Sequence, residues 1–174
     1  MMEQREHMLL DQVDGRDRPV GHIRRADIFK KRANFRVAHI LLFSPDGRLL
    51  LQKIAPTHNR HPGYWGSSVA GYVKAGESYE NAARRKLQEE LGIEDIPLKR
   101  LGKISMLDEG AKKFIVIFTA TYGGALQPNP EDFAALEFVS LNQFQAKKVK
   151  RRFTPTFEHV LQYLFDKLPA AKGG

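Results

Sequence analysis

Cysteine is absent from this sequence of 174 residues, which excludes a disulfide, a thiolate zinc site and a cysteine nucleophile. Apolar runs are short, and none approaches the ~20 residues that a helix needs to cross a bilayer. The first ten residues, MMEQREHMLL, also lack the apolar core of a secretory signal. We therefore expect a cytoplasmic protein without a membrane-spanning segment.

Acidic residues are fewer than basic ones, with 20 Asp and Glu against 28 Lys and Arg, and the formal net charge is +8. A positive charge of this size attracts anionic partners at long range. A nucleotide, a diphosphate and RNA all fit this charge, and so does a basic surface without a specific partner. A length of 174 residues suits one domain with a core that needs no disulfide or structural metal.

Strand patterns outnumber helix patterns along the chain. Residues 9–25 form two short apolar runs around a turn, which predicts a hairpin. Two β-rich runs, 37–43 and 49–54, flank the turn sequence SPDG, and the apolar run 114–122 predicts a buried strand. An amphipathic helix is expected over 154–168. Because a helical segment also lies between the strands, the pattern indicates an α/β sandwich with a mixed sheet.

The segment GESYENAARRKLQEELGI, residues 76–93, predicts that central helix. Ser78 is placed to cap its first turn and Gly92 to end it. At ~100° per residue the small and apolar side chains form one buried stripe, and Glu90 falls at its edge. A carboxylate in that place is costly unless a cation meets it. Glu89 points the same general way.

Two neighbouring acids on one rim suit a hard divalent cation such as Mg2+, which prefers oxygen ligands and keeps several waters. The same spacing also fits a solvated helix face on which Arg, Lys and Glu form i,i+4 pairs. Periodicity alone does not decide between a metal site and such a face.

The spacing around the helix extends into a longer motif. Gly71 is followed by five residues and Glu77, then by seven residues and Arg85, and then by KLQEELGI. This pattern resembles the Nudix box, G-x5-E-x7-R-E-U-x-E-E-x-G-U, in which U is apolar. One defining position departs from it, because Lys86 stands where the box has Glu.

The resemblance covers roughly residues 36–141 and implies a Nudix-type α/β/α sandwich with a mixed β-sheet. We expect a single Nudix domain over 1–174. Within it, 1–35 is an N-terminal hairpin extension, 36–141 is the core, and 142–174 is a C-terminal helical segment.

The resemblance also implies a Mg2+- or Mn2+-dependent hydrolase that cleaves a nucleoside diphosphate derivative or a related diphosphate. Glu89 and Glu90 are then metal ligands, and the Gly71 carbonyl is a further one. Glu77 and Arg85 form a supporting pair that fixes the loop against the helix. Such a site must neutralise charge and activate a water, because a diphosphate repels an attacking hydroxide.

The flanking segments VDGRDRPVG, LLFSPDGRLLLQK and HPGYWGSSVAGYVKAGES resemble the isopentenyl-diphosphate isomerase-like branch of this superfamily. In that branch the catalytic Cys falls at Ala70 and a metal-binding His at Tyr72. Two glutamates of the branch fall at about Ala111 and Lys113. None of these groups is present here, so isomerase activity is not expected.

Lys86 lies i,i+3 to Glu89 and i,i+4 to Glu90, within reach of both carboxylates. Three interpretations remain open. Lys86 swings outward and leaves a weakened working site; or its ammonium partly replaces a second metal and stabilises phosphate charge; or it neutralises the acids. The third gives the alternative function, a catalytically weak module that binds a nucleotide or RNA.

Further candidates lie outside the helix. Many proteins of the family that it resembles carry an acid six residues before an aromatic on the last strand, which selects Asp132 here. Asp108 and Glu109 are weaker candidates that also fit a turn. Lys53 and Arg60 are expected, with Lys86, to meet substrate phosphates, although each also fits a solvated surface.

The basic run KKVKRR, residues 147–152, fits RNA contact or a solvated helix end. A homodimer is left open by the sequence, as is the identity of the diphosphate.

Overall fold

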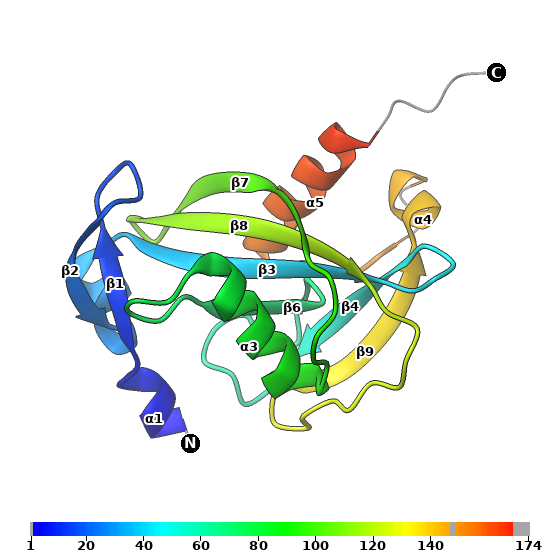
Figure 1. Cartoon of the computed structure of the whole chain (residues 1–174), viewed down its shortest axis with the longest axis horizontal. Coiled ribbons are helices and arrows are strands. Elements are labelled where there is room, and N and C mark those ends of the chain that lie inside the picture. The colour runs from blue at the N-terminus through cyan, green and yellow to red at the C-terminus, as the bar shows by residue number, and fades with distance from the viewer. Residues whose placement is uncertain (1, 147–148, 169–174) are drawn as a thin grey trace.

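The computed structural model describes residues 2–146 and 149–168, which form a mixed β-sheet covered by helices (Figure 1). The strand order is β5-β4-β3-β8-β7, with β6 paired to β3 and β9 paired to β4. The strands are β3 (Phe35–Phe43), β4 (Arg48–Ile54), β5 (Trp65–Gly66), β6 (Val69–Tyr72), β7 (Lys99–Asp108), β8 (Ala111–Thr121) and β9 (Phe133–Ser140). The pair β3·β8 is parallel and the other pairs are antiparallel, which confirms the mixed sheet.

Two helices cover opposite faces of this sheet. In Figure 1, α3 (Tyr79–Leu91) crosses in front of the strands and α5 (Pro155–Lys167) lies behind them. A short helix, α4 (Leu141–Gln145), follows β9. The predicted α/β/α sandwich is therefore confirmed. None of the helices among the described residues is long and apolar enough to cross a membrane.

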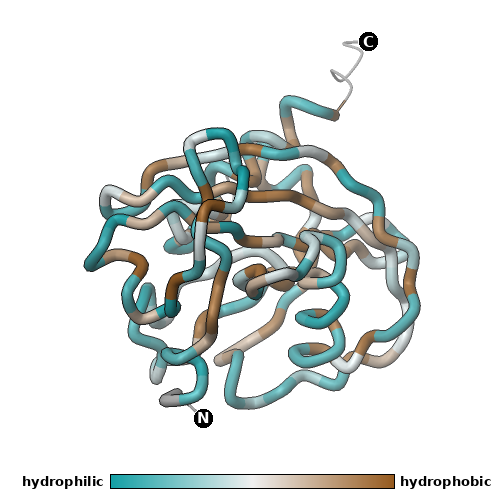
Figure 2. Tube along the Cα trace, turned by 60° about the vertical axis from the view of Figure 1, so that its left-hand side comes forward, coloured by the Kyte–Doolittle hydropathy of each residue, from teal (hydrophilic) through white to brown (hydrophobic). Residues whose placement is uncertain are grey.

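The strand β3 is buried on both faces, which explains why its apolar run is continuous. Ala38 and Ile40 pack with the residues of α3, whereas Val37 and Leu41 pack on the opposite side. A strand buried on both faces needs apolar side chains at both sets of positions. Figure 2 shows hydrophobic residues along the central strands and hydrophilic ones on the surface loops and much of α3.

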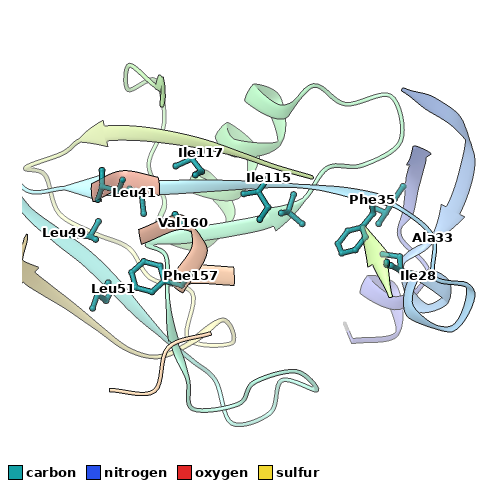
Figure 3. Close-up of a cluster of buried hydrophobic side chains, with 14 of the residues drawn as sticks. Ile28, Ala33, Phe35, Leu41, Leu49, Leu51, Ile115, Ile117, Phe157 and Val160 are labelled. Atoms are coloured by element: carbon teal, nitrogen blue, oxygen red, sulfur yellow. The ribbon is translucent and has the colours of Figure 1, made fainter. Parts of the chain in front are cut away.

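The face opposite α3 holds a cluster centred on Phe157 and Val160 of α5 (Figure 3). Leu41 of β3 and Ile117 of β8 point into this cluster from the sheet. Thr154 caps α5 by accepting a hydrogen bond from the Phe157 N–H at 3.1 Å. The amphipathic helix predicted from the pattern is therefore present and buries its apolar face.

The N-terminal segment forms the predicted hairpin and packs against the loop that precedes α3. Its elements are α1 (Met2–Glu6), β1 (Leu9–Val13), β2 (Pro19–Arg24), the 3-10 helix η1 (Arg25–Asp27) and α2 (Ile28–Lys31). Leu10 of β1 forms a bridge to Lys74, and the Asp11 carboxylate accepts from the Gly76 N–H at 3.1 Å. Asp17 in the hairpin turn accepts from the Tyr79 hydroxyl at 2.7 Å. The hairpin therefore braces the start of α3.

Candidate metal and diphosphate site

The strand, loop and helix from β6 to α3 are fixed by local signals at both ends of the helix. The Ser78 hydroxyl accepts from the Asn81 N–H at 3.0 Å, as an N-cap does. Gly92 ends the helix with φ +66°, in the left-handed region that glycine adopts without strain. Leu87 and Leu91 are buried on the side of the helix that packs against the sheet. The orientation that periodicity predicted is therefore the one observed.

Arg85 ties the loop to the helix. Its guanidinium donates to both Glu77 oxygens, at 2.8 and 2.9 Å, and to the Tyr72 carbonyl at 3.0 Å. Burial alone would raise the pKa of Glu77, but the hydrogen bonds from Arg85 and the Lys74 N–H hold it below its usual range. Glu77 is thus an ionised partner of Arg85 that holds the shape of the loop.

Lys86 points inward. Its ammonium lies 3.3 Å from Glu90 Oε1 and 3.4 Å from Glu89 Oε2, and its side chain is only 15% exposed. The outward arrangement considered from the sequence is therefore not the one that the structure has. Its stem rests on Gly71, where an added Cβ would lie 2.6 Å from Lys86 Cδ and 2.8 Å from Cε. The missing side chain of Gly71 is what makes room for the lysine.

Glu90 carries an unpaired buried atom. The residue is 6% exposed, and among the described residues its Oε2 has no hydrogen-bond partner. Burial raises the pKa of Glu90 to about 7, Lys86 lowers it, and Asp132 adds to the rise. An unpaired buried carboxylate oxygen is unfavourable unless a ligand completes it. Glu89 is more exposed and pairs with Arg85 at 3.4 Å as well as with Lys86.

Asp132 reaches the same cluster from the loop before β9. The Asn129 N–H donates to the Glu90 carbonyl at 2.9 Å, which fastens this loop to the end of α3. Asp132 is 5% exposed and accepts from Arg5 of α1 at 2.7 Å. Burial lowers the pKa of the nearby His58, and Arg5 lowers it further, whereas Asp132 raises it. Sequence reasoning missed Arg5, which carries no local motif and lies 127 positions from its partner.

The donor set fits a divalent ion that substrate and water complete. Among the residues described, no group of three or more His, Asp or Glu side chains is arranged to hold a metal alone. Mg2+, however, is commonly bound through one or two carboxylates together with substrate phosphates and waters. Glu90 Oε2 and the neighbouring Glu89 would supply those carboxylates. Metal ligation by Glu89, Glu90, Gly71 and Asp132 stays a prediction.

The structure pairs Arg60 with Asp108 rather than leaving it open to a phosphate. The two side chains are joined at 2.7 and 3.2 Å, and the Lys113 ammonium donates to the same carboxylate at 2.7 Å. Burial alone would raise the pKa of Asp108, but these cations hold it below its usual range. Glu109, with φ +48°, shapes the following turn. Lys53 lies on β4 opposite Trp65, and its role stays a prediction.

The positions of the isomerase-like groups hold other chemistry. Tyr72 stacks on Phe35, with ring centroids 5.6 Å apart, and Arg25 lies 4.5 Å above the tyrosine ring. Lys113 is buried and donates to Thr156 at 2.6 Å as well as to Asp108. An aromatic stack and an ion pair therefore occupy the region in which the isomerase-like branch has its His and glutamates.

The basic run 147–152 is only partly described, since Lys147 and Lys148 lie outside the described residues. Arg151 pairs with Glu137 at 2.7 Å, and its guanidinium lies 4.4 Å from the Trp65 ring centroid. At least this part of the run contacts the protein itself.

The α/β/α sandwich with paired acids at the end of the central helix agrees with the relatives of this chain, several of which are named Nudix hydrolases, a class of enzymes that act on phosphorus-containing anhydrides. The sequence matches the NUDIX domain over residues 33–158, and the chain belongs to the Nudix family. Nudix hydrolases generally use divalent metals.

Similar proteins carry related names. An uncharacterized Nudix hydrolase of Pseudomonas aeruginosa is 34% identical over 131 residues, which cover 75% of this chain and 78% of that protein. The isopentenyl-diphosphate Delta-isomerase 2 of Photorhabdus laumondii is 43% identical over 89 residues, 51% of this chain and 50% of its own. The prenyl-diphosphate phosphatase of Methanosarcina mazei is 28% identical over 163 residues, 90% of this chain and 95% of its own. The expected likeness to the isomerase-like branch is confirmed.

The fold also matches solved structures. The crystal structure of DR0079 from Deinococcus radiodurans superposes with a TM-score of 0.75 at 26% identity, covering 88% of this chain and 98% of that one. The predicted Nudix-type fold is confirmed.

Proposed function

We propose that this protein is a Mg2+- or Mn2+-dependent hydrolase that cleaves a nucleoside diphosphate derivative or a related diphosphate by attack of water on phosphorus. One observation carries the proposal: Glu90 has a buried oxygen that finds no hydrogen-bond partner in the described part of the chain, and it lies beside Glu89 on a helix held by the Arg85–Glu77 pair. The net charge of +8 favours an anionic substrate. The name of the Methanosarcina mazei relative, a prenyl-diphosphate phosphatase, supports a diphosphate among the candidates.

Each residue of the site has a role that follows from its contacts. Glu89 and Glu90 would hold the divalent ion, which when bound supplies positive charge to the diphosphate and lowers the pKa of a water. Arg85 and Glu77 hold the loop against the helix that carries the two acids. Lys86 presents an ammonium between the same acids, where it offsets negative charge that phosphate oxygens bring.

A second candidate is a binding module for a nucleotide or RNA with weak catalysis. The observation that favours it is that Lys86 pairs with both glutamates and Arg5 pairs with Asp132, so that each acid already has a cation. The two candidates differ in turnover, which is directly measurable.

The test is hydrolysis of a panel of nucleoside diphosphates, sugar nucleotides and prenyl diphosphates with Mg2+, with Mn2+ or with EDTA, in which all products are separated by chromatography. Cleavage of a sugar nucleotide between its phosphates releases a nucleoside monophosphate and a sugar phosphate, so free phosphate alone would not report it. Glu90→Gln preserves shape while removing charge, and we expect it to lower kcat/KM by about 10²-fold or more. Glu80→Gln is the matched control, because Glu80 lies on the same helix but pairs with Arg84 on the surface. Measurable ligand binding without metal-dependent turnover of any panel member would refute the hydrolase and favour the binding module.

Cytoplasmic location and a homodimer are further proposals. Light scattering after size exclusion tests the dimer, and a monomer across the working concentration range would refute it. Cell fractionation tests the location, and a labelled RNA titrated at two salt concentrations tests contact with RNA.

A further inference from the structure

The Lys86–glutamate contact is partly buried, unlike an ordinary surface pair. The Lys86 side chain is 15% exposed and that of Glu90 is 8% exposed. Exposed i,i+4 pairs contribute only a few tenths of a kcal/mol, because water and salt screen them. A pair withdrawn from water interacts more strongly, and breaking it leaves an uncompensated charge. The position of the ammonium is therefore fixed by its surroundings.

The strand below Lys86 fixes that position from the other side. The stem lies on Gly71 of β6, in space that any side chain at 71 would fill. The ammonium then lies 3.3 Å from Glu90 Oε1 and 3.4 Å from Glu89 Oε2. A divalent ion bridging these two carboxylates must compete with it for the same oxygens. Glu90 Oε2 has no partner among the described residues, so one further cation can still bind there.

The charges in the site lead to the same conclusion. Glu89, Glu90 and Asp132 contribute negative charge, and a diphosphate adds more. Lys86 and Arg5 already supply two positive charges to these acids from within the chain, and Arg85, which is shared with Glu77, also pairs with Glu89. Fewer bound metal ions are then needed to offset the repulsion between these carboxylates and a diphosphate.

We propose that the Lys86 ammonium takes the place of one divalent cation in this site and binds a phosphoryl oxygen of the diphosphate. The wild-type site then binds one divalent ion fewer than a Lys86→Glu variant. The proposal rests on the proposed function insofar as the ligand is a diphosphate.

Two binding experiments test it without turnover. In the first, Mn2+ is titrated into wild type and Lys86→Glu, with free Mn2+ followed by electron paramagnetic resonance and heat by calorimetry. We expect one additional Mn2+ per chain in Lys86→Glu, because a carboxylate replaces the internal cation. In the second, non-hydrolysable methylenediphosphonate is titrated into wild type and Lys86→Met in EDTA.

Lys86→Met keeps an apolar stem over Gly71 while removing the charge, so it is suited to remain folded, as circular dichroism will verify. Loss of one charge-assisted hydrogen bond should weaken methylenediphosphonate binding by about tenfold or more. Lys167→Met, at the end of α5 on the other face of the sheet, is the matched control and should bind like wild type.

Equal Mn2+ stoichiometry in wild type and Lys86→Glu, or equal diphosphonate affinity in wild type and Lys86→Met, overturns the proposal. These outcomes are separable from failure of the proposed function. If the panel shows no hydrolysis but both binding differences appear, the hydrolase is refuted and the role of Lys86 stands. If hydrolysis occurs without the binding differences, only the role of Lys86 is refuted.

Discussion

A side chain at Gly71 must displace Lys86, and this contact gives a quantitative prediction. In Gly71→Ala the new Cβ would lie 2.6 Å from Lys86 Cδ and 2.8 Å from Cε. The φ of Gly71 is not in the left-handed region, so the backbone itself accepts alanine. The cost therefore comes from overpacking, at about 1–3 kcal/mol in the free energy of unfolding.

Removal of the lysine stem removes that cost. In Lys86→Ala the same glycine substitution should be nearly neutral, which gives a coupling energy of about 1–3 kcal/mol in a double-mutant cycle. Urea unfolding of the four proteins in EDTA measures the coupling, with equal m-values as the check on two-state behaviour. Gly66→Ala is the matched control, because its nearest neighbour, Thr154, lies at 3.6 Å and the change should be additive with Lys86→Ala. A Gly71→Ala cost that is the same in both backgrounds would refute the contact.

Three further changes probe Arg85, Arg5 and His39, a buried histidine of β3 whose Nδ1 lies 2.8 Å from the Ser67 hydroxyl oxygen. Arg85→Lys loses the paired hydrogen bonds to Glu77, so urea unfolding should show a free energy of unfolding lower by about 1.5–3 kcal/mol. An unchanged midpoint would contradict the view that the Arg85–Glu77 pair holds the loop against the helix. Burial lowers the pKa of His39 to about 3, below its value in the unfolded chain. Below pH 6.5 the unfolded chain binds a proton at this histidine that the folded protein does not, so the free energy of unfolding is highest above pH 6.5 and decreases as the pH falls. Wild type should then lose about 2 kcal/mol more than His39→Asn between pH 8 and pH 5, and parallel curves would exclude this. Arg5→Ala leaves buried Asp132 without its cation, which should cost about 1–3 kcal/mol in EDTA and be partly restored by Mg2+. Thermal unfolding with and without Mg2+ checks this, and an unfolding temperature of Arg5→Ala that Mg2+ does not change would argue against Asp132 as a ligand.

Features fixed by neighbours in sequence could be predicted. Ser78 and Gly92 bound the central helix because capping and left-handed backbone are local properties. The edge position of Glu90 followed from helical periodicity, and the burial of β8 followed from its continuous apolar run.

Features that depend on contacts between distant segments could not be predicted from the sequence. The parallel pairing of β3 with β8 joins strands far apart in the chain, and no local pattern reports it. The inward position of Lys86 depends on the space above Gly71, which exists only once β6 and α3 are packed. The sequence offered Asp108 as a weaker site candidate or as part of a turn, and its pairing with Arg60, 48 positions away, arises only in the folded protein.

The Mg2+ dependence of diphosphate hydrolysis by wild type and Glu90→Gln is the most direct measurement of what this site does. With the best substrate of the panel, kcat/KM of wild type should rise with Mg2+ to a plateau and vanish in EDTA. Glu90→Gln should remain about 10²-fold or more below it at every Mg2+ concentration. A wild-type rate that does not depend on a divalent ion, or a Glu90→Gln rate equal to wild type, would contradict a diphosphate hydrolase built on Glu89 and Glu90.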